Sequence, residues 1–174
     1  MAEKIYHPGE SYQYPLIIKK LLNTPLTYSP DQEIVYDDKE RYIYRILNER
    51  ISRLASGLEQ MGVTQGDMVA VFDYDSHRYL ECFFAVPMMG AVLHTINIRL
   101  STEHLIYTIN HAEDEVLFVD ATLAPLIAPI QHELPTVRHW VVMDGDPAAS
   151  GIDGAVGYEE LLAESEPTGH WPSV

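Results

Sequence analysis

The 174-residue sequence has one cysteine, Cys82, and its four lysines all lie within the first 39 residues. A single cysteine rules out an internal disulfide, which excludes the disulfide framework of small exported domains. The apolar run "ECFFAVPMMGAVL" is shorter than the roughly 20 residues that span a bilayer, so no transmembrane segment is expected. The opening residues "MAEKIYHPGE" lack the apolar stretch of a signal peptide, and a cytoplasmic location is therefore expected.

Positive charge is also scarce, because 11 Lys and Arg residues stand against 26 Asp and Glu residues, with a formal net charge of -15. Such a chain repels phosphate backbones, so nucleic acid is not an expected partner. The phosphate-cradling patterns G-x-x-x-x-G-K and G-x-G-x-x-G are absent, as is the G-x-S-x-G turn that exposes a nucleophilic serine. No motif of these types therefore assigns a catalytic residue.

Hydrophobic periodicity predicts the secondary structure. Apolar residues recur at alternating steps of three and four between Tyr44 and Met61, which predicts an amphipathic helix that ends at Gly62. Ser76 and Ser101 stand where each can cap a further helix. A helix broken by prolines is expected in "TLAPLIAPIQ", and a short one in "YEELLAES". Buried strands are predicted for the runs "MVAVF", "AVLHTI", "EVLFVD" and "RHWVVM".

The order of these elements predicts the fold class. Strands separated by helices of about ten or more residues cannot pair as hairpins, so they are expected to lie parallel. The predicted class is α/β, a three-layer sandwich with a mainly parallel sheet and helices on both faces. Residues 1–43 contain four prolines and are expected to form an N-terminal extension, with a short hairpin in "EIVYDDKERYIY". Residues 44–174 are the expected α/β subdomain, in which "DGDPAASGIDGAVG" is a turn-rich, exposed segment.

Carboxylates follow the predicted strands. Asp73 and Asp75 come after the first strand and Asp120 after the third, so they would meet at the carboxyl edge of a parallel sheet. One interpretation is a Mg²⁺-dependent phosphotransfer domain, although that chemistry also needs a cation on the phosphoryl group, and no lysine follows Lys39. The other interpretation is that these side chains cap helices and form turns. A non-catalytic α/β binding module is a third possibility.

Several segments from Tyr42 onward resemble a known family: "YRILNERISRLASGL", "GVTQGDMVAV", "AVPMMGAVLHTINIRLS" and "INHAEDEVLFVD". They are similar to the amino-terminal portion of the acyl-adenylate-forming enzymes, the AMP-dependent synthetase and ligase superfamily. The segment "GAVLHTINIRLS" resembles the medium- and long-chain fatty acyl-CoA synthetases most. The resemblance implies the N-terminal subdomain of a large domain. It also implies a reaction in which a fatty acid and Mg-ATP form an acyl adenylate, whose acyl group passes to coenzyme A.

The resemblance also carries expectations about sites and partners. In that superfamily the phosphate-binding loop follows a segment like "YEELLAESEPTGHWPSV", so the catalytic residues are expected beyond Val174. ATP, Mg²⁺ and coenzyme A are expected cofactors of the whole enzyme, and the chain alone is expected to bind none of them and to be inactive. The expected partners are the remainder of its own protein and small-molecule substrates, with a homodimer for the isolated chain. Asn97 and Arg99 lie in the loop after a predicted strand, and in related synthetases the matching loop borders the channel through which coenzyme A enters, so an arginine there is expected to contact a phosphate. His94 is expected to be packed or hydrogen-bonded and not to act as a base.

Overall fold

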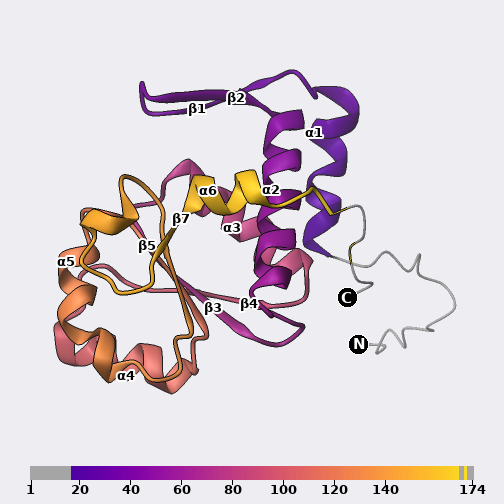
Figure 1. Cartoon of the computed structure of the whole chain (residues 1–174). Coiled ribbons are helices and arrows are strands. Elements are labelled where there is room, and N and C mark those ends of the chain that lie inside the picture. The colour runs from indigo at the N-terminus through magenta and orange to yellow at the C-terminus, as the bar shows by residue number, and fades with distance from the viewer. Residues whose placement is uncertain (1–16, 169–170, 172–174) are drawn as a thin grey trace, which may run out of the picture.

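A five-stranded parallel sheet forms the centre of the protein (Figure 1). We describe it from a computed structural model that covers residues 17–168 and residue 171. The strand order is β4-β3-β5-β6-β7, and every neighbouring pair is parallel. The strands are β3 (Met68–Phe72), β4 (Val92–Thr95), β5 (Val116–Val119), β6 (His139–Val142) and β7 (Val156–Gly157). The predicted α/β class and parallel sheet are confirmed.

Helices cover both faces of the sheet, which confirms the three-layer sandwich (Figure 1). Val69 and Val71 of β3 pack with α2 (Tyr44–Gln60), α3 (His77–Met88) and α6 (Tyr158–Glu164). Their neighbours Ala70 and Phe72 point to the other face, because successive side chains of a strand alternate. That face is covered by α4 (Thr102–Ala112), α5 (Ala124–Ile127) and η2 (Ala128–Glu133).

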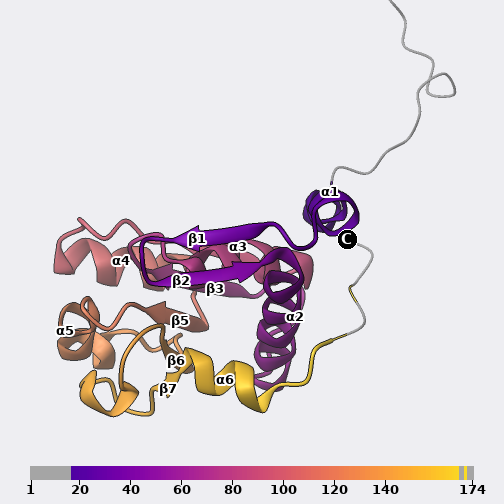
Figure 2. The same ribbon diagram turned by 90° about the horizontal axis from the view of Figure 1, so that it is seen from above.

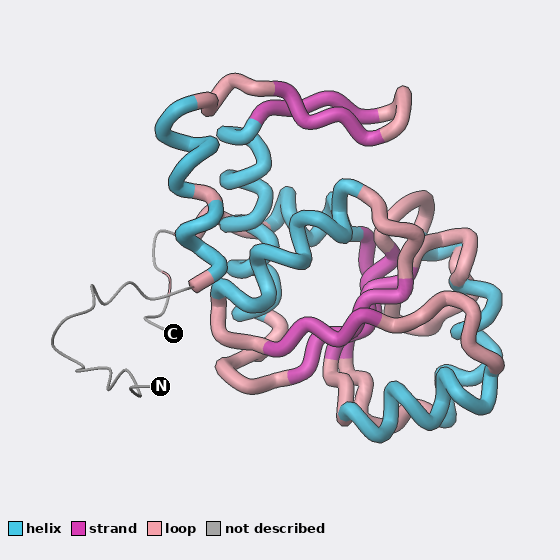
Figure 3. The backbone as a smooth tube through the Cα atoms, turned by 180° about the vertical axis from the view of Figure 1, so that it is seen from behind, coloured by secondary structure: helices cyan, strands magenta, loops and turns pink. Residues whose placement is uncertain are grey.

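A hairpin precedes the sandwich. Strand β1 (Glu33–Tyr36) pairs antiparallel with β2 (Glu40–Ile43), and in Figure 3 the pair lies apart from the central strands. Seen from above in Figure 2, the hairpin lies over α3 and β3. The hairpin in "EIVYDDKERYIY" was therefore predicted correctly. The division of the chain at residue 43 stays a prediction, and residues 1–16 of the expected extension lie outside the described residues.

Four short elements were not expected from the sequence. The extension holds two short helices, η1 (Ile18–Leu21) and α1 (Asn23–Tyr28), because Pro25 lies in the first turn of α1, where no backbone N–H is needed. The turn-rich segment after β6 contains η3 (Pro147–Ala149) and the two-residue strand β7, which is too short to show a period.

Among the described residues, no helix has both the length and the apolar character needed to cross a membrane.

Local signals in the sequence place the other helix ends as predicted. Helix α2 ends just before Gly62, whose φ of 90° is accessible to glycine at low cost. The hydroxyl of Ser76 accepts the backbone N–H of Tyr79 at the start of α3, and that of Ser101 accepts the N–H of His104 at the start of α4. The segment 122–131 is divided between α5 and η2, which confirms the expected break at the prolines.

Helices α2 and α6 touch at Gly57, which is buried. A β-carbon at this position would lie 2.8 Å from Leu161 Cδ1 and 2.9 Å from Ser165 Oγ, closer than carbon atoms normally approach. The absence of a side chain at Gly57 therefore sets how closely α6 crosses α2.

We predict that Gly57→Ala lowers the free energy of unfolding by about 1 kcal/mol. Alanine favours a helix by up to about 1 kcal/mol, but overpacking this contact costs about 1–3 kcal/mol. Urea unfolding followed by circular dichroism measures the difference. Ser56→Ala, at the preceding half-buried position, is the control and is expected to change stability by less than about 0.5 kcal/mol. A Gly57→Ala chain as stable as the unmodified one would contradict the close contact.

Candidate functional site

The carboxyl edge of the sheet gathers polar residues from four strands. Asp73 follows β3, Asn97 follows β4, Asp120 follows β5 and Asp144 lies shortly after β6. Ligands of open α/β sheets bind outside the carboxyl ends of the strands. A ligand site is therefore expected at this edge of the sheet.

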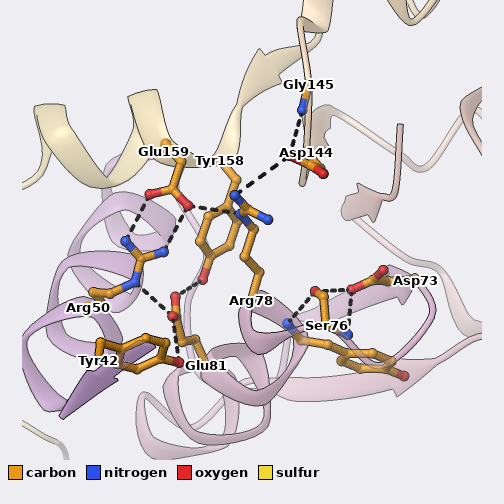
Figure 4. A network of polar contacts seen from close by, with 11 residues as sticks. Tyr42, Arg50, Asp73, Ser76, Arg78, Glu81, Asp144, Gly145, Tyr158 and Glu159 are labelled. Carbon is orange, nitrogen blue, oxygen red and sulfur yellow. Dashed lines mark hydrogen bonds and ion pairs between the residues drawn. The ribbon is translucent and has the colours of Figure 1, made fainter. Parts of the chain in front are cut away.

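Asp73 organises the turn between β3 and α3 (Figure 4). Its buried carboxylate accepts the N–H of Tyr74 at 2.6 Å, the N–H of Ser76 at 3.3 Å and the hydroxyl of Ser76. Burial raises the pKa of Asp73, and the bonds from Ser76 and Tyr74 act in the opposite direction. Asp75 adopts the left-handed conformation with a φ of 62°. Asp73 thus holds the residue that caps α3.

Asp120 has a similar local role. Its carboxylate accepts the N–H of Thr122 at 2.8 Å and also the hydroxyl of Thr122. Within residues 17–168, no three His, Cys, Asp or Glu side chains are grouped to hold a metal ion. Asp73, Asp75 and Asp120 therefore do not form the metal cluster that the phosphotransfer interpretation needs, and the turn and cap interpretation accounts for Asp73 and Asp120.

Asn97 and Arg99 lie in the turn that follows β4, and both are exposed. The side-chain oxygen of Asn97 accepts the backbone N–H of Arg99 at 2.9 Å, which forms an Asx turn. Among the described residues, no carboxylate forms an ion pair with the Arg99 guanidinium. The structure therefore fixes the backbone of this turn and leaves the arginine side chain open to solvent.

His94 is held by a buried partner. Its Nδ1 lies 2.7 Å from Asp114 Oδ2, and the Asp114 side chain has no exposed surface. Burial raises the pKa of Asp114, and the hydrogen bond with His94 opposes that shift. Asp114 stands before the amino end of β5, away from the carboxyl edge. The predicted hydrogen bonding of His94 is confirmed, and the expectation that His94 does not act as a base stays a prediction.

A pocket of 420 Å³ lies between the β1–β2 hairpin and the carboxyl ends of β3, β5 and β6. Sequence reasoning identified its acidic residue Asp120 but did not predict a pocket here. Its wall is formed by residues of the hairpin, of the turn that begins α3, and of the segments after β5 and β6: Tyr36, Lys39, Glu40, Tyr74, Ser76, His77, Arg78, Asp120, Thr122, Met143 and Asp144.

An ion-pair network fixes Arg78 at the wall of this pocket (Figure 4). Arg78 Nε donates to Glu159 at 2.9 Å, and a second nitrogen of Arg78 lies 3.8 Å from Asp144. Glu159 also receives a two-point pair from Arg50, at 2.8 and 2.9 Å. Glu159 therefore orients both guanidinium groups and connects α6 to α2 and α3.

His77 is the buried titratable residue of the wall, with 6% of its surface exposed. Its ring lies 5.4 Å from the ring of Tyr36 and 6.0 Å from that of Tyr42. Burial lowers the pKa of His77 to about 4, and the positive charges of Arg78 and Arg50 act in the same direction. The imidazole is therefore neutral at physiological pH.

Sequence reasoning missed His77 and Glu81, although a signal for both exists. They stand four residues apart in α3, on the same face as the buried apolar residues Ala85 and Met88. A polar residue on an apolar helical face is expected to be buried with a partner or to serve a ligand.

Comparison with known proteins gives three findings. The family described as AMP-binding enzyme matches residues 24–169. The long-chain-fatty-acid–CoA ligase of Thermus thermophilus is 48% identical over 124 residues, which are 71% of this chain and 22% of that protein. The medium-chain-fatty-acid–CoA ligase of Ectopseudomonas oleovorans is 34% identical over 172 residues, 95% of this chain and 32% of that protein.

The solved structures agree in fold. An anthranilate CoA ligase in complex with anthranoyl-AMP superposes with a TM-score of 0.83 at 22% identity, over 91% of this chain and 30% of that chain. A protein of Rhodopseudomonas palustris described as a "putative long-chain-fatty-acid CoA ligase" gives a TM-score of 0.77 at 22% identity, over 88% of this chain and 38% of that chain. The chain thus spans about a fifth to a third of the length of the curated relatives above.

We predict that His77 makes the fold sensitive to acid. Its pKa is about 4 in the folded chain and about 6.5 when unfolded. As the pH falls from 6.5 to 4, the unfolded chain binds this proton and the folded chain does not. His77 therefore lowers the free energy of unfolding by up to about 1.4 kcal/mol per pH unit in that window and has no such effect above it. Urea unfolding at a series of pH values measures the slope.

His77→Phe is expected to reduce this slope by about one proton. His132→Gln is the control, because the His132 side chain is 77% exposed, and it is expected to leave the slope unchanged. If the His77→Phe chain and the unmodified chain lost stability equally between pH 6.5 and 4, the neutral buried state of His77 would be disproved.

Proposed function

The chain belongs to the family of AMP-binding enzymes, and on that premise we propose that it forms part of an ATP-dependent ligase that joins a fatty acid to coenzyme A. The similarity to the long- and medium-chain-fatty-acid–CoA ligases supports the choice of substrate class. A carboxylate is a poor electrophile. Attack of the carboxylate on the α-phosphate of ATP releases pyrophosphate and forms an acyl adenylate, in which AMP is a good leaving group. The thiol of coenzyme A then attacks the acyl carbon, loses its proton and displaces AMP, which gives the thioester.

The turn after β4 is the observation that carries the role of this chain. Asn97 fixes the backbone of Arg99, and the arginine side chain is exposed without a carboxylate partner among the described residues. We assign Arg99 to a phosphate of coenzyme A, and Asn97 to the shape of the turn. A charge-assisted contact of this kind contributes about 1.5–3 kcal/mol.

ATP and Mg²⁺ belong to the same proposal, but we give this chain no residue for them. The described residues form no group of three metal ligands, and the sequence has no lysine beyond residue 39 to meet a phosphoryl group. The phosphate-binding and catalytic residues are assigned to the remainder of the enzyme. We place the reaction in the cytoplasm, where ATP and coenzyme A are available, and within lipid metabolism.

We predict that Arg99→Ala weakens the binding of coenzyme A by the complete enzyme about tenfold or more, because one phosphate contact is lost. Isothermal titration calorimetry measures both constants. Arg41→Ala is the matched control, since Arg41 is also exposed but pairs with Glu33 at 3.5 Å on the hairpin. Equal binding by the Arg99→Ala and Arg41→Ala chains would remove Arg99 from the proposal.

The ligase activity itself is tested by exchange of pyrophosphate into ATP with a panel of fatty acids. The 174 residues alone are expected to give none. The gene sequence beyond Val174 is expected to encode a Ser/Thr/Gly-rich phosphate loop and a later catalytic lysine, and a protein that includes them is expected to form the acyl-CoA thioester. Pyrophosphate exchange by the 174-residue chain above a buffer control would contradict the assignment of the catalytic residues to the remainder of the enzyme.

We also propose that the isolated chain forms a homodimer. Two large apolar side chains of the short N-terminal helices are exposed, Leu21 at 66% and Tyr28 at 81%. Leu21 and Tyr28 also line a 630 Å³ pocket between α1, β1, α2 and α3. Exposed apolar surface around such a pocket favours association with a partner. The acidic charge of the chain opposes association at low salt.

Sedimentation velocity is expected to show a dimer that persists or strengthens in high salt, because salt screens charge repulsion and leaves apolar burial intact. Leu21→Asp is expected to shift the chain toward monomer. Tyr107→Ser, at an exposed aromatic residue of α4, is the control and is expected to leave the dimer intact. A monomer at both salt concentrations would refute this proposal.

A further inference from the structure

Strand β4 is an open edge of the central sheet. It pairs with β3 on one side, and among residues 17–168 no strand lies on its other side. The N–H groups of Val92 and Ile96 donate to backbone oxygens on the β3 side at 2.9 and 3.0 Å. Because the N–H groups of successive residues in a strand point in opposite directions, the N–H and C=O groups of Leu93 and Thr95 point outward.

The sequence of this edge offers no protection against pairing with another strand. Residues 90–98, GAVLHTINI, contain no Asp, Glu, Lys, Arg or Pro, in a chain with a net charge of -15 and 11 prolines. Natural proteins protect an open edge with charges, prolines, bulges or a covering segment. Val92 of β4 is 44% exposed, and Phe83 of the adjacent helix α3 is 45% exposed. A covering strand would therefore satisfy backbone groups and also bury apolar surface.

The first described residue lies near the amino end of this strand. Ile17 lines a pocket of 310 Å³ together with Gly90 and Ala91, and Ala91 directly precedes β4. Residues 1–16 therefore join the described part of the chain close to the open edge. At roughly 3.3 Å per residue such a stretch reaches about 50 Å, whereas a strand as long as β4 spans only roughly 13 Å.

Residues 10–14 have the sequence pattern of a short strand. The run is ESYQY, with Pro8 before it and Pro15 directly after it. Tyrosine favours strands, and prolines mark where strands end. Tyr12 and Tyr14 are two positions apart, so in a strand their rings lie on one face. The run is thus as long as β4 requires and has one aromatic face to place on exposed apolar side chains.

The position of Ile17 sets the direction of pairing. The carboxyl end of the 10–14 run is the end close to Ile17, and Ile17 lies near the amino end of β4. The run would therefore lie antiparallel to β4, as an edge strand often does on an otherwise parallel sheet. The short linker also keeps the run at an effective concentration of about the millimolar range, which favours it over a second copy in dilute solution.

We propose that residues 10–14 add an antiparallel strand to the open edge of β4. Their backbone groups hydrogen-bond with those of Leu93 and Thr95, and the rings of Tyr12 and Tyr14 cover apolar side chains beside the edge. The occupant is a segment of this same chain. This inference rests on the sheet edge and on the sequence of the segment, and it is independent of the proposed ligase function.

Hydrogen exchange of the 174-residue chain, followed residue by residue by nuclear magnetic resonance, tests the proposal. The N–H groups of Leu93 and Thr95 are expected to exchange slowly. The double variant Tyr12→Pro/Gln13→Pro removes two N–H donors from the run, so exchange at both positions is expected to accelerate about tenfold or more. The N–H of His94 points toward β3, and its slow exchange in every variant shows that the sheet remains folded.

The matched control is Ala2→Pro/Glu3→Pro, which places two prolines in the same N-terminal stretch but outside the 10–14 run. It is expected to leave exchange at Leu93 and Thr95 unchanged. Fast exchange at these two positions in the unmodified chain would show that the edge is uncovered and would overturn the proposal. Slow exchange that persists in the Tyr12→Pro/Gln13→Pro chain would overturn it as well, because another segment would then cover β4.

Nuclear Overhauser contacts identify the occupant directly. Contacts between residues 10–14 and β4 are expected within one chain, with the cross-strand pattern of an antiparallel pair. A mixture of isotope-labelled and unlabelled chains separates contacts within a chain from contacts between chains. If the contacts of β4 arose only between labelled and unlabelled chains, the occupant would be a second copy, and the proposal would be refuted.

Discussion

The buried carboxylate of Glu81 is the interaction on which the helical side of the sandwich depends. Its side chain has no exposed surface, and it accepts hydrogen bonds from Arg50 at 2.7 Å, Tyr158 at 2.7 Å and Tyr42 at 3.3 Å. These partners come from α2, α6 and β2, so one carboxylate connects the hairpin with three helices. Burial raises the pKa of Glu81, and the pairing with Arg50 opposes that shift. Loss of one partner from a buried pair typically costs about 3–5 kcal/mol.

The same network determines the shape of the pocket. Arg50 bridges Glu81 and Glu159, and Glu159 in turn holds Arg78 against the pocket wall. The hairpin joins this network at Tyr42, whose hydroxyl donates to Glu81 and whose ring lies beside that of His77. Arg50, Glu81 and Glu159 do not line the pocket, yet they set its geometry. Because Glu159 lies in α6, the packing of α6 determines the position of the Arg78 guanidinium in the pocket wall.

Features with a local cause were predictable from the sequence. The periodicity from Tyr44 to Met61 predicted α2, and Ser76 and Ser101 predicted the starts of two helices, because capping acts over only a few residues. Strand β7 was not predicted, because two residues cannot display alternation. The partners of Glu81 were not predicted either. Arg50 lies 31 residues and Tyr158 77 residues away, and no periodic pattern relates residues so distant.

In the candidate site, too, the features with a local cause were predictable and those set by tertiary packing were not. The turns at Asp73 and Asp120 follow from the preference of aspartate for accepting nearby N–H groups, although their positions in the sequence were equally compatible with a metal site. The assignment of Asn97 and Arg99 came from family resemblance, and the structure adds the turn between them. The pocket requires the hairpin to lie over the sheet edge, an arrangement set by tertiary packing that His77 alone does not reveal.

The contact between α2 and α6 has a consequence for the order of folding. Arg50 and Glu159, which pair across it, are 109 residues apart, so the entropy of closing a long loop must be overcome before they meet. Helix α2 has its own strong local pattern, whereas α6 has seven residues and little stability apart from its contacts. We expect α6 to dock late and to undock first as one cooperative unit. In that opened state Glu81 loses Tyr158 and gains water, so local opening would begin at the carboxylate that joins the helices.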